Sequence, residues 1–257
     1  GIATGNKKYK PSNYDLDQML ELVLQSPNIK QIRFAGGEPF IMPEVEKFIT
    51  ALVDENKTQI ELDFITNVTT VKPKLFDMLQ QFDRTTVNCS IDGVGEELEY
   101  QRYPVKWNTV DKNFRAIWAY RGPTFRVCIA PCISMLNTLT VDKFLEWTLE
   151  FSGLALSYNE VLQPSFQNFR HIPLDARQHT IQRLDKIKTQ VIDARTQVGN
   201  PSHAANWKRF IEQDIHVYKP MSDKDKQTLK HYALDIWDYK CNTKFLDAYP
   251  WAEQLWT

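Results

Sequence analysis

The sequence has no long apolar run, little cysteine and almost no net charge. No stretch approaches the ~20 apolar residues of a membrane-spanning helix, which argues against a transmembrane protein. The cysteines, Cys89, Cys128, Cys132 and Cys241, are too few and too scattered for a disulfide framework. A formal net charge of -1 gives no electrostatic reason to expect a nucleic acid or an anionic membrane as partner.

What is present is the composition of an ordinary globular protein, with 42% hydrophobic and 25% charged residues. A chain of 257 residues can bury one sizeable core, alone or with a helical appendage. The start, Gly1-Ile2-Ala3-Thr4-Gly5, has neither an initiator methionine nor the apolar segment of a signal peptide. We therefore expect an N-terminally truncated chain from the reducing cytoplasm.

Strand-like and helix-like segments alternate along the first two thirds of the chain. The expected strands are Ile29–Ala35, Gln59–Ile65, Thr85–Ile91, Thr124–Ile133 and Leu154–Val161. The segments with helical spacing are Asp15–Leu24, Val45–Val53 after Pro43, Lys72–Phe82, Glu96–Gln101, Thr109–Tyr120 and Val141–Phe151. This alternation predicts an α/β protein whose parallel strands curl into a partial (β/α) barrel resembling a TIM barrel.

The pattern changes after Pro164, where no further strand is predicted. Helices are expected over Leu174–Val198, Ala204–Asp214 and Lys224–Trp237, with Ser222 as a cap of the third. The chain is therefore divided into a barrel-like core, residues 1–165, and a helical C-terminal extension, residues 166–257. The aromatic side chains of the tail are expected to pack this extension against the barrel; they are Trp237, Tyr239, Phe245, Tyr249, Trp251 and Trp256.

Small or polar residues stand at the end of every expected strand. Parallel α/β proteins place their sites at the C-terminal ends of their strands, so matching ends predict one polar pocket at that rim. The ends are Gly36-Gly37-Glu38, Thr66-Asn67, Ser90 with Asp92-Gly93, Ser134 with Asn137, and Asn159-Glu160. Loops are usually polar, so any one of these five strand ends, considered by itself, is also compatible with an ordinary surface loop.

Four of these features resemble the core of the radical S-adenosylmethionine (radical SAM) enzymes. They are Gly36-Gly37-Glu38-Pro39, Thr66-Asn67, Ser90-Ile91-Asp92-Gly93 and the downstream Arg102. The resemblance covers about residues 15–165. Members of this family carry a Cys-x3-Cys-x2-Cys motif before the Gly-Gly-Glu-Pro turn, but no cysteine precedes the turn here.

The resemblance implies a site for S-adenosylmethionine at the rim. In the family, the Gly-Gly-Glu backbone holds the amino group of the ligand, and an ammonium needs acceptors that approach it without an intervening Cβ. By matching the motif, the candidate residues are Gly36, Gly37, Glu38, Pro39, Thr66, Asn67, Ser90, Asp92 and Arg102. Ser134 and Asn137, at the next strand end, complete the candidate set.

Several of these residues also allow a structural interpretation. The glycine turn is compatible with a tight turn that binds nothing. The resemblance places Asp92 near the ribose hydroxyls, whereas its position also suits a cap of the following helix. It places Arg102 near the methionyl carboxylate, which a guanidinium fork suits, although a lone arginine is often a solvated surface group.

Cys128 and Cys132 imitate part of a cluster motif but are interpreted differently. They lie four residues apart within the expected strand Thr124–Ile133, on one face, as thiols of a core often do. Cys89 is also expected in the core. Cys241, alone in the tail, has no assigned role, and no metal ligand is assigned in this chain.

The resemblance implies a radical SAM enzyme, or part of one. In such an enzyme a reduced [4Fe-4S] cluster cleaves S-adenosylmethionine to a 5′-deoxyadenosyl radical, which modifies a substrate. The expected partners are a small-molecule or peptide substrate and a reductant for the cluster. Two alternatives remain open: a cluster-less relative that binds a nucleotide-like ligand or a partner protein, and a partial (β/α) barrel of an unrelated catalytic class.

Overall fold

The computed structural model describes residues 16–198, 201–233 and 245–255. Five strands form one parallel sheet in the order β1 (Gln31–Phe34), β2 (Glu61–Thr66), β3 (Thr85–Cys89), β4 (Phe125–Ile129) and β6 (Ala155–Leu156). The order follows the sequence without reversal, which is the winding of a (β/α) barrel rather than of a doubly wound sheet. In the described residues the sheet is open, with β1 and β6 at its edges. The predicted partial barrel is confirmed.

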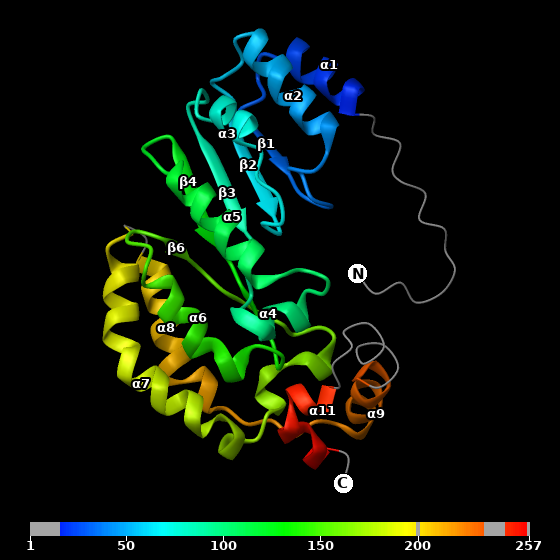
Figure 1. The fold of residues 1–257 in the computed structure, drawn as a ribbon, viewed down its shortest axis with the longest axis vertical. Helices are drawn as coiled ribbons and strands as arrows, with labels where there is room; N and C mark the ends of the chain where they lie inside the picture. Colours follow the sequence, from blue (N-terminus) through cyan, green and yellow to red (C-terminus); the bar gives the residue numbers. More distant parts are fainter. Residues whose placement is uncertain (1–15, 199–200, 234–244, 256–257) are drawn as a thin grey trace.

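The helices follow the strands as the alternation predicted (Figure 1). In the core they are α1 (Leu16–Gln25), α2 (Pro43–Asp54), α3 (Pro73–Leu79), α4 (Gly95–Gln101), α5 (Trp107–Ala119) and α6 (Val141–Thr148). Pro43 and Pro73 begin their helices, where a missing N–H leaves no bond unmade. The predicted first residue of α1, Asp15, lies outside the described residues.

Two of the predicted strands are interrupted. The segment Thr124–Ile133 forms β4 and then a separate short strand, β5 (Cys132–Ile133). The segment Leu154–Val161 likewise forms β6 and β7 (Asn159–Glu160), and β5 pairs with β7 in a second parallel sheet. The break in the first falls at Pro131, which has no N–H for a ladder, although its carbonyl accepts from the N–H of Asn159 at 2.9 Å.

One face of the main sheet packs against helices. Phe34 and Phe64 stack with ring centroids 4.9 Å apart, and Phe34 meets Phe48 of α2 edge to face at 5.6 Å. The ring centroids of Phe76 in α3 and Phe125 in β4 are 6.1 Å apart. These rings are buried and form the centre of the core. Because side chains alternate along a strand, the intervening residues point to the opposite face.

The C-terminal extension is helical, and no strand follows Glu160 in the described residues. Its helices are α7 (Leu174–Thr196), α8 (Pro201–Glu212), α9 (Asp223–His231) and α11 (Phe245–Ala248). They gather below the sheet in Figure 1. Short 3-10 helices complete the chain at η1 (Thr138–Thr140), η2 (Ser165–Gln167), η3 (Phe169–His171), η4 (Asp214–His216) and η6 (Pro250–Leu255). None of the described helices has the length and apolarity to cross a bilayer.

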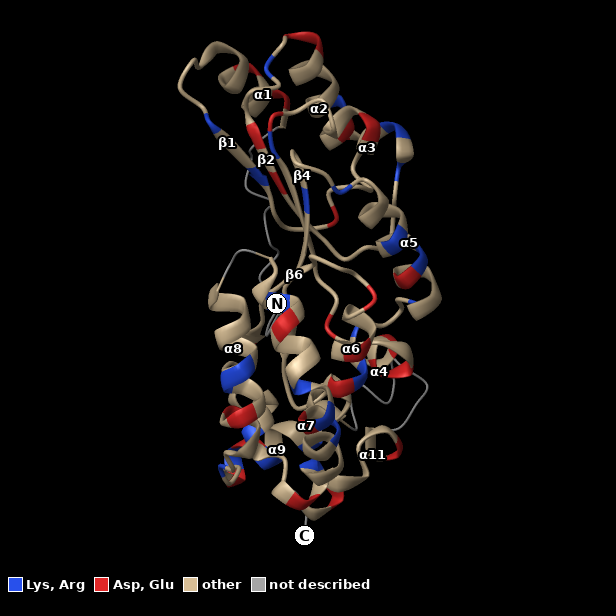
Figure 2. Ribbon diagram, turned by 90° about the vertical axis from the view of Figure 1, so that its left-hand side faces the viewer, with Lys and Arg blue, Asp and Glu red and all other residues tan. Residues whose placement is uncertain are grey.

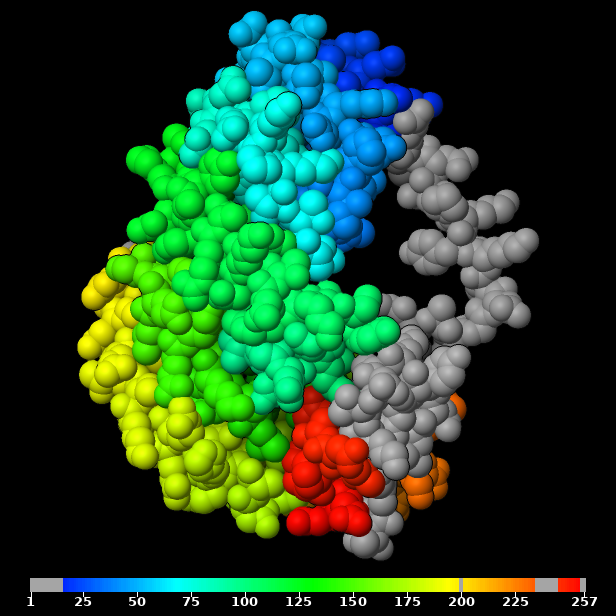
Figure 3. Space-filling model, in the orientation of Figure 1, coloured from blue at the N-terminus to red at the C-terminus, as the bar shows by residue number. Residues whose placement is uncertain are grey.

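The tail packs against the core through its aromatic residues, as predicted for those that the structure describes. Phe245, Tyr249 and Trp251 are buried. Tyr249 meets Tyr100 of α4 edge to face at 5.4 Å and donates a hydrogen bond to the carbonyl of Leu136 at 2.9 Å. Figure 3 shows this last segment, in red, against the green segment that contains α4. The other tail positions, Trp237, Tyr239, Trp256 and Cys241, lie outside the described residues.

Candidate functional site

The turn after β1 exposes bare backbone at the C-terminal rim of the sheet. Gly36 and Gly37 have φ angles of 97° and 63°, in the left-handed region that favours glycine. A Cβ at either position would meet no atom within 4 Å, so the conformation, rather than crowding, requires glycine here. Both residues are exposed, and their backbone groups make no hydrogen bond to another described residue. The turn therefore presents unused carbonyl and amide groups.

The Glu38 carboxylate ties this turn to the end of β2. One of its oxygens, Oε1, accepts from the Thr66 hydroxyl at 2.7 Å and from the Phe40 N–H at 3.3 Å. The other, Oε2, accepts from the Asn67 N–H at 2.7 Å. Glu38 and Pro39 are buried. The side chain of Glu38 is therefore a brace between two strand ends, a role that the motif by itself did not indicate.

The residues after β2 continue the rim. Thr66 is buried, and its Oγ1 accepts from the Val68 N–H at 3.0 Å. The Asn67 side chain accepts from the N–H and hydroxyl of Thr69 through Oδ1, while its Nδ2 has no partner among the described residues. Val68 has a φ of 64°, which a β-branched residue rarely adopts. Such local strain is often found at functional sites.

The end of β3 joins the same rim. The Ser90 N–H donates to the carbonyl of Thr66 at 2.8 Å. The half-buried Ser90 hydroxyl makes no hydrogen bond within the described part of the chain. The Ser90 hydroxyl and the Asn67 Nδ2 are therefore both available for hydrogen bonds at this rim.

Asp92 and Arg102 form an ion pair just beyond β3. The Nε and Nη2 of Arg102 lie 2.6 and 2.5 Å from Asp92 Oδ2, and the Cys132 N–H donates to Oδ1 at 2.8 Å. The Asp92 side chain is 5% exposed and that of Arg102 is 27% exposed. Helix α4 begins after Val94 without a side-chain cap, so the alternative of Asp92 as a helix cap is wrong. The alternative of Arg102 as a solvated surface group is wrong as well.

Ser134 and Asn137 lie in a buried turn after β5. Asn137 donates through Nδ2 to the carbonyls of Asp92 and Cys132, at 2.7 and 2.9 Å, and accepts from the Ser134 N–H at 2.8 Å. The Ser134 hydroxyl accepts from the Leu136 N–H at 3.1 Å. Both residues are 2% exposed. The structure thus brings them to the rim with their side chains engaged inside the protein.

The cysteines differ from the prediction in part. Cys89 is buried as predicted, but Cys128 is half-buried and Cys132 is exposed, so the core role predicted for this pair is wrong. The two lie on separate strands because the chain is interrupted at Pro131. Burial raises the pKa of all three thiols, and Asp92 further raises that of Cys132. In the described residues no group of three His, Cys, Asp or Glu side chains is placed to hold a metal ion.

The second face of the sheet is polar, which the pattern of strand ends does not predict. Asp63 of β2 is 4% exposed. It accepts from Arg33 of β1, whose Nε lies 2.7 Å from Oδ2, and from Asn88 of β3 at 2.6 Å. Figure 2 shows charged positions on β1, β2 and β4. The period-two alternation of polar and apolar residues in β1 and at the start of β2 is the signal that identifies this face.

Comparison with known proteins identifies the family of the chain. The sequence model of the Radical SAM superfamily matches residues 3–147, more than half of the chain. The GTP 3',8-cyclase of Campylobacter lari is 34% identical over 73 residues, which cover 28% of this chain and 22% of the cyclase.

Solved structures show the same fold at low sequence identity. Native anSMEcpe with bound AdoMet superposes with a TM-score of 0.51 and 16% identity, over 69% of this chain and 52% of that protein. Native anSMEcpe with bound AdoMet and the Kp18Cys peptide gives a TM-score of 0.50 and 16% identity, over 70% and 52% of the two chains. The chain thus spans about half the length of these structures. Because the family model matches more than half of the chain, the chain belongs to the radical SAM superfamily.

Proposed function

We propose that this chain forms the S-adenosylmethionine-binding part of a radical SAM enzyme. The observation that carries the proposal is the exposed Gly36-Gly37 turn with unused backbone groups, at a rim that also presents Asn67 and Ser90. The Glu38 carboxylate joins the turn to β2, and the Ser90 N–H joins β2 to β3. A ligand at the rim would therefore meet several strand ends that are rigidly connected.

The glycine turn suits the amino group of the ligand. The carbonyls of Gly36, Gly37 and Glu38 are acceptors for an ammonium, and the two glycines allow close approach. The left-handed φ angles of Gly36 and Gly37 fix the directions of their carbonyls before a ligand arrives, and the Glu38 carbonyl is held by the Ile41 N–H at 3.1 Å. Pro39 is buried behind the turn, where it restricts the backbone.

The neighbouring strand ends supply groups for the rest of the ligand. In the proposal, the Asn67 amide and the Ser90 hydroxyl contact the ribose and methionyl parts, because they have hydrogen-bonding capacity left. The Arg102 guanidinium keeps its Nη1 for a carboxylate while its other nitrogens hold Asp92. The Asp92 carboxylate is occupied by Arg102 and the Cys132 N–H, so we assign it the role of orienting Arg102.

Thr66, Ser134 and Asn137 belong to the proposed site as supports. The side chains of Thr66 and Asn137 connect strand ends, and the Ser134 hydroxyl accepts from the Leu136 N–H within its own turn. Rigid supports of this kind keep the contacting groups in position. We therefore narrow the set proposed to touch the ligand to Gly36, Gly37, Glu38, Asn67, Ser90 and Arg102.

The two family cofactors fit the described residues differently. The exposed glycine turn suits S-adenosylmethionine, whereas Cys89, Cys128 and Cys132 do not converge as ligands of a [4Fe-4S] cluster. When both cofactors are bound, they supply the radical chemistry of the family. The described residues bind and orient the nucleotide, and we assign them no cluster ligand.

The activity, substrates and partners of the whole protein are part of the proposal. The cyclase relative acts on GTP by its name, and one solved neighbour holds a peptide. We accordingly propose a small-molecule or peptide substrate, a reductant for the cluster and a cytoplasmic location. The C-terminal helices, residues 166–257, are proposed as an extension of the barrel core, residues 1–165.

Calorimetric titration with S-adenosylmethionine tests the site. Gly36→Val is expected to weaken binding at least tenfold, because a β-branched residue disfavours the left-handed turn that presents the carbonyls. Gly153→Val is the matched control, since Gly153 also has a positive φ, of 79°, with nothing within 4 Å of an added Cβ. Both variants should lose similar stability. Equal affinity of the two variants for S-adenosylmethionine would exclude the turn as the site.

Formation of 5′-deoxyadenosine tests the radical activity separately. The full-length protein is reconstituted anaerobically with iron, sulfide, a reductant and S-adenosylmethionine, and the product is quantified by mass spectrometry. We expect 5′-deoxyadenosine from the wild type and at least a tenfold smaller amount from Gly36→Val. A protein with an intact cluster that yields no product would instead be the alternative expected from the sequence, a relative without radical chemistry.

A further inference from the structure

The polar face of the sheet carries one row of side chains across four strands. The register pairs Arg33 with Asp63, Asp63 with Thr86, and Thr86 with Arg126. On β4 the alternate residues Phe125 and Val127 are buried against the helices, so Arg126 points to the polar face. Neighbouring strands are about 4.8 Å apart, which places Thr86 and Arg126 side by side.

Among the described residues, the charged side chains of this face form ion pairs, except for Arg126. Arg33 is held by Asp63, and Arg84 lies 3.4 Å from the Glu61 carboxylate. Arg126 is exposed and makes no ion pair with a described residue. The Thr86 hydroxyl beside it also makes no hydrogen bond in the described residues. A guanidinium and a hydroxyl are thus available together.

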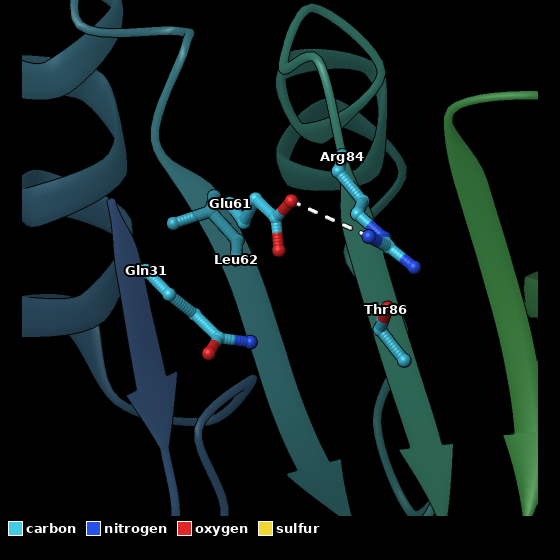
Figure 4. A pocket seen from close by; sticks show the side chains of 5 residues that line it. All are labelled: Gln31, Glu61, Leu62, Arg84 and Thr86. Atoms are coloured by element: carbon cyan, nitrogen blue, oxygen red, sulfur yellow. Dashed lines mark hydrogen bonds and ion pairs between the residues drawn. The ribbon is translucent and has the colours of Figure 1, made fainter.

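A hollow lies on the same face and is bordered by Thr86. It has a volume of about 190 Å³ and is lined by Gln31, Glu61, Leu62, Arg84 and Thr86. Figure 4 shows the polar side chains of Gln31, Glu61, Arg84 and Thr86 standing on the same face of β1, β2 and β3. The two carboxylates of the face, Glu61 and Asp63, each have an arginine partner.

The charge of Arg126 also acts on the helical extension. The pKa of His203 in α8 is lowered mainly by burial, and the charges of Arg195 and Arg126 lower it further. Arg195 is fully buried and has no carboxylate partner in the described chain, and its Nε makes no hydrogen bond. Arg126 and Arg195 therefore both influence this imidazole, and neither forms an ion pair with a carboxylate among the described residues.

We propose that Arg126 and Thr86 bind an oxyanion group of the substrate, a carboxylate or a phosphate. The guanidinium fork matches both groups, and the hydroxyl adds a donor. This inference rests on the proposed function, because it treats the polar face as the side from which the substrate reaches the rim. From Thr86 to Ser90 the strand rises about 13 Å at ~3.3 Å per residue, so the anchored substrate spans about that length.

Anion-dependent thermal stability tests this site without knowledge of the substrate. The Tm of the wild type is measured with inorganic phosphate and, separately, with succinate, while sodium chloride holds the ionic strength constant. Binding to the folded state raises the Tm by mass action. A shift with phosphate alone identifies a phosphate site, and a shift with succinate alone identifies a carboxylate site. The absence of both shifts would overturn the proposal.

Matched variants locate the anion. Arg126→Gln is expected to weaken the apparent affinity at least tenfold, and Thr86→Val about threefold. Arg121→Gln is the control and should leave the anion response unchanged, because Arg121 is exposed but lies over the Trp118 ring of α5, away from this face. An unchanged anion response in both Arg126→Gln and Thr86→Val would refute the site. If Arg126→Gln fails to fold, Thr86→Val alone decides the question.

Titration with S-adenosylmethionine separates this inference from the proposed function. Arg126→Gln should bind S-adenosylmethionine as the wild type does. The strand register sets Arg126 level with Arg33, which precedes the Gly36-Gly37 turn along β1. A wild-type chain that binds phosphate but not S-adenosylmethionine would contradict the proposed function and leave the oxyanion site standing. A chain that binds S-adenosylmethionine but responds to neither phosphate nor succinate would leave the function standing and refute the oxyanion site.

Discussion

At the scale of single residues, Glu38 is a structural connection at the rim. Its buried carboxylate accepts three hydrogen bonds, from Thr66, Asn67 and Phe40, and so connects the turn after β1 to the end of β2. Hydrogen bonds to an ionised group are stronger than neutral ones, and a buried donor left without an acceptor is costly. The side chain therefore fixes the glycine turn while the backbone remains free for a ligand.

Replacing Glu38 should destabilise the protein and impair ligand binding together. Glu38→Ala is expected to lower the free energy of unfolding by about 3 kcal/mol, because three donors lose their acceptor. Glu38→Gln should lose about half as much, since one amide oxygen still accepts. Urea unfolding measures the stability, and calorimetry measures S-adenosylmethionine affinity. Glu44→Gln, on the exposed side of α2, is the control and should change neither.

Asp92 shows why a single residue could not be interpreted from the sequence. Its position before α4 suited a helix cap, and the family resemblance suited a ribose contact. In the fold, Arg102 and the Cys132 N–H occupy both of its oxygens. Cys132 is forty positions away along the chain, so only the tertiary structure brings that donor to Asp92.

At the level of helices and strands, local sequence signals set the starts of the helices. Pro43, Pro73 and Ser222 each mark a helix start. The Ser222 hydroxyl accepts from the Asp225 N–H at 3.2 Å and donates to the Asp225 carboxylate at 2.8 Å. This exchange satisfies one of the free N–H groups of the first turn of α9.

Ser222→Ala should therefore destabilise α9. We expect a loss of about 1 kcal/mol in the free energy of unfolding, the usual effect of removing a capping hydroxyl. Ser222→Thr and Ser222→Asp should retain most of the stability, because each keeps an acceptor at the cap. Chemical denaturation monitored by circular dichroism compares the variants. A Ser222→Ala protein as stable as Ser222→Asp would show that the cap contributes nothing.

Across the whole molecule, the helical extension is attached to the core by buried hydrogen bonds. Four of its side chains donate to backbone carbonyls of the core. Thr180 donates to Leu139 at 2.7 Å, Arg195 to Leu154 at 2.8 Å, Trp207 to Leu156 at 3.1 Å and Tyr249 to Leu136 at 2.9 Å. Burial lowers the pKa of Arg195 to about 10, so it is still charged at neutral pH and donates strongly.

These contacts predict that core and extension unfold as one unit. Arg195→Ala should lower the free energy of unfolding by about 3 kcal/mol, because the Leu154 carbonyl and the Thr148 hydroxyl lose their partner. Hydrogen exchange measured along a denaturant series should show α3 and α5 losing protection together with α7 and α8. Earlier exposure of α7 and α8 alone would establish residues 166–257 as a separate unit.

The order of strands and helices, the parallel α/β class and the Gly-Gly-Glu-Pro turn follow from the amino-acid sequence alone. They depend on local properties: hydrophobic period, helix-starting residues and the left-handed freedom of glycine. The sequence also predicts that polar residues meet at one rim, since parallel strands end on the same side.

How those residues are used is a property of the folded chain. Folding places Glu38, Thr66, Asp92 and Asn137 in buried hydrogen bonds, divides the predicted strand at Pro131 and exposes Cys132. It also aligns Arg33, Asp63, Thr86 and Arg126 in one row. The physical reason is that these outcomes depend on partners from distant strands and on register, neither of which a local sequence pattern specifies.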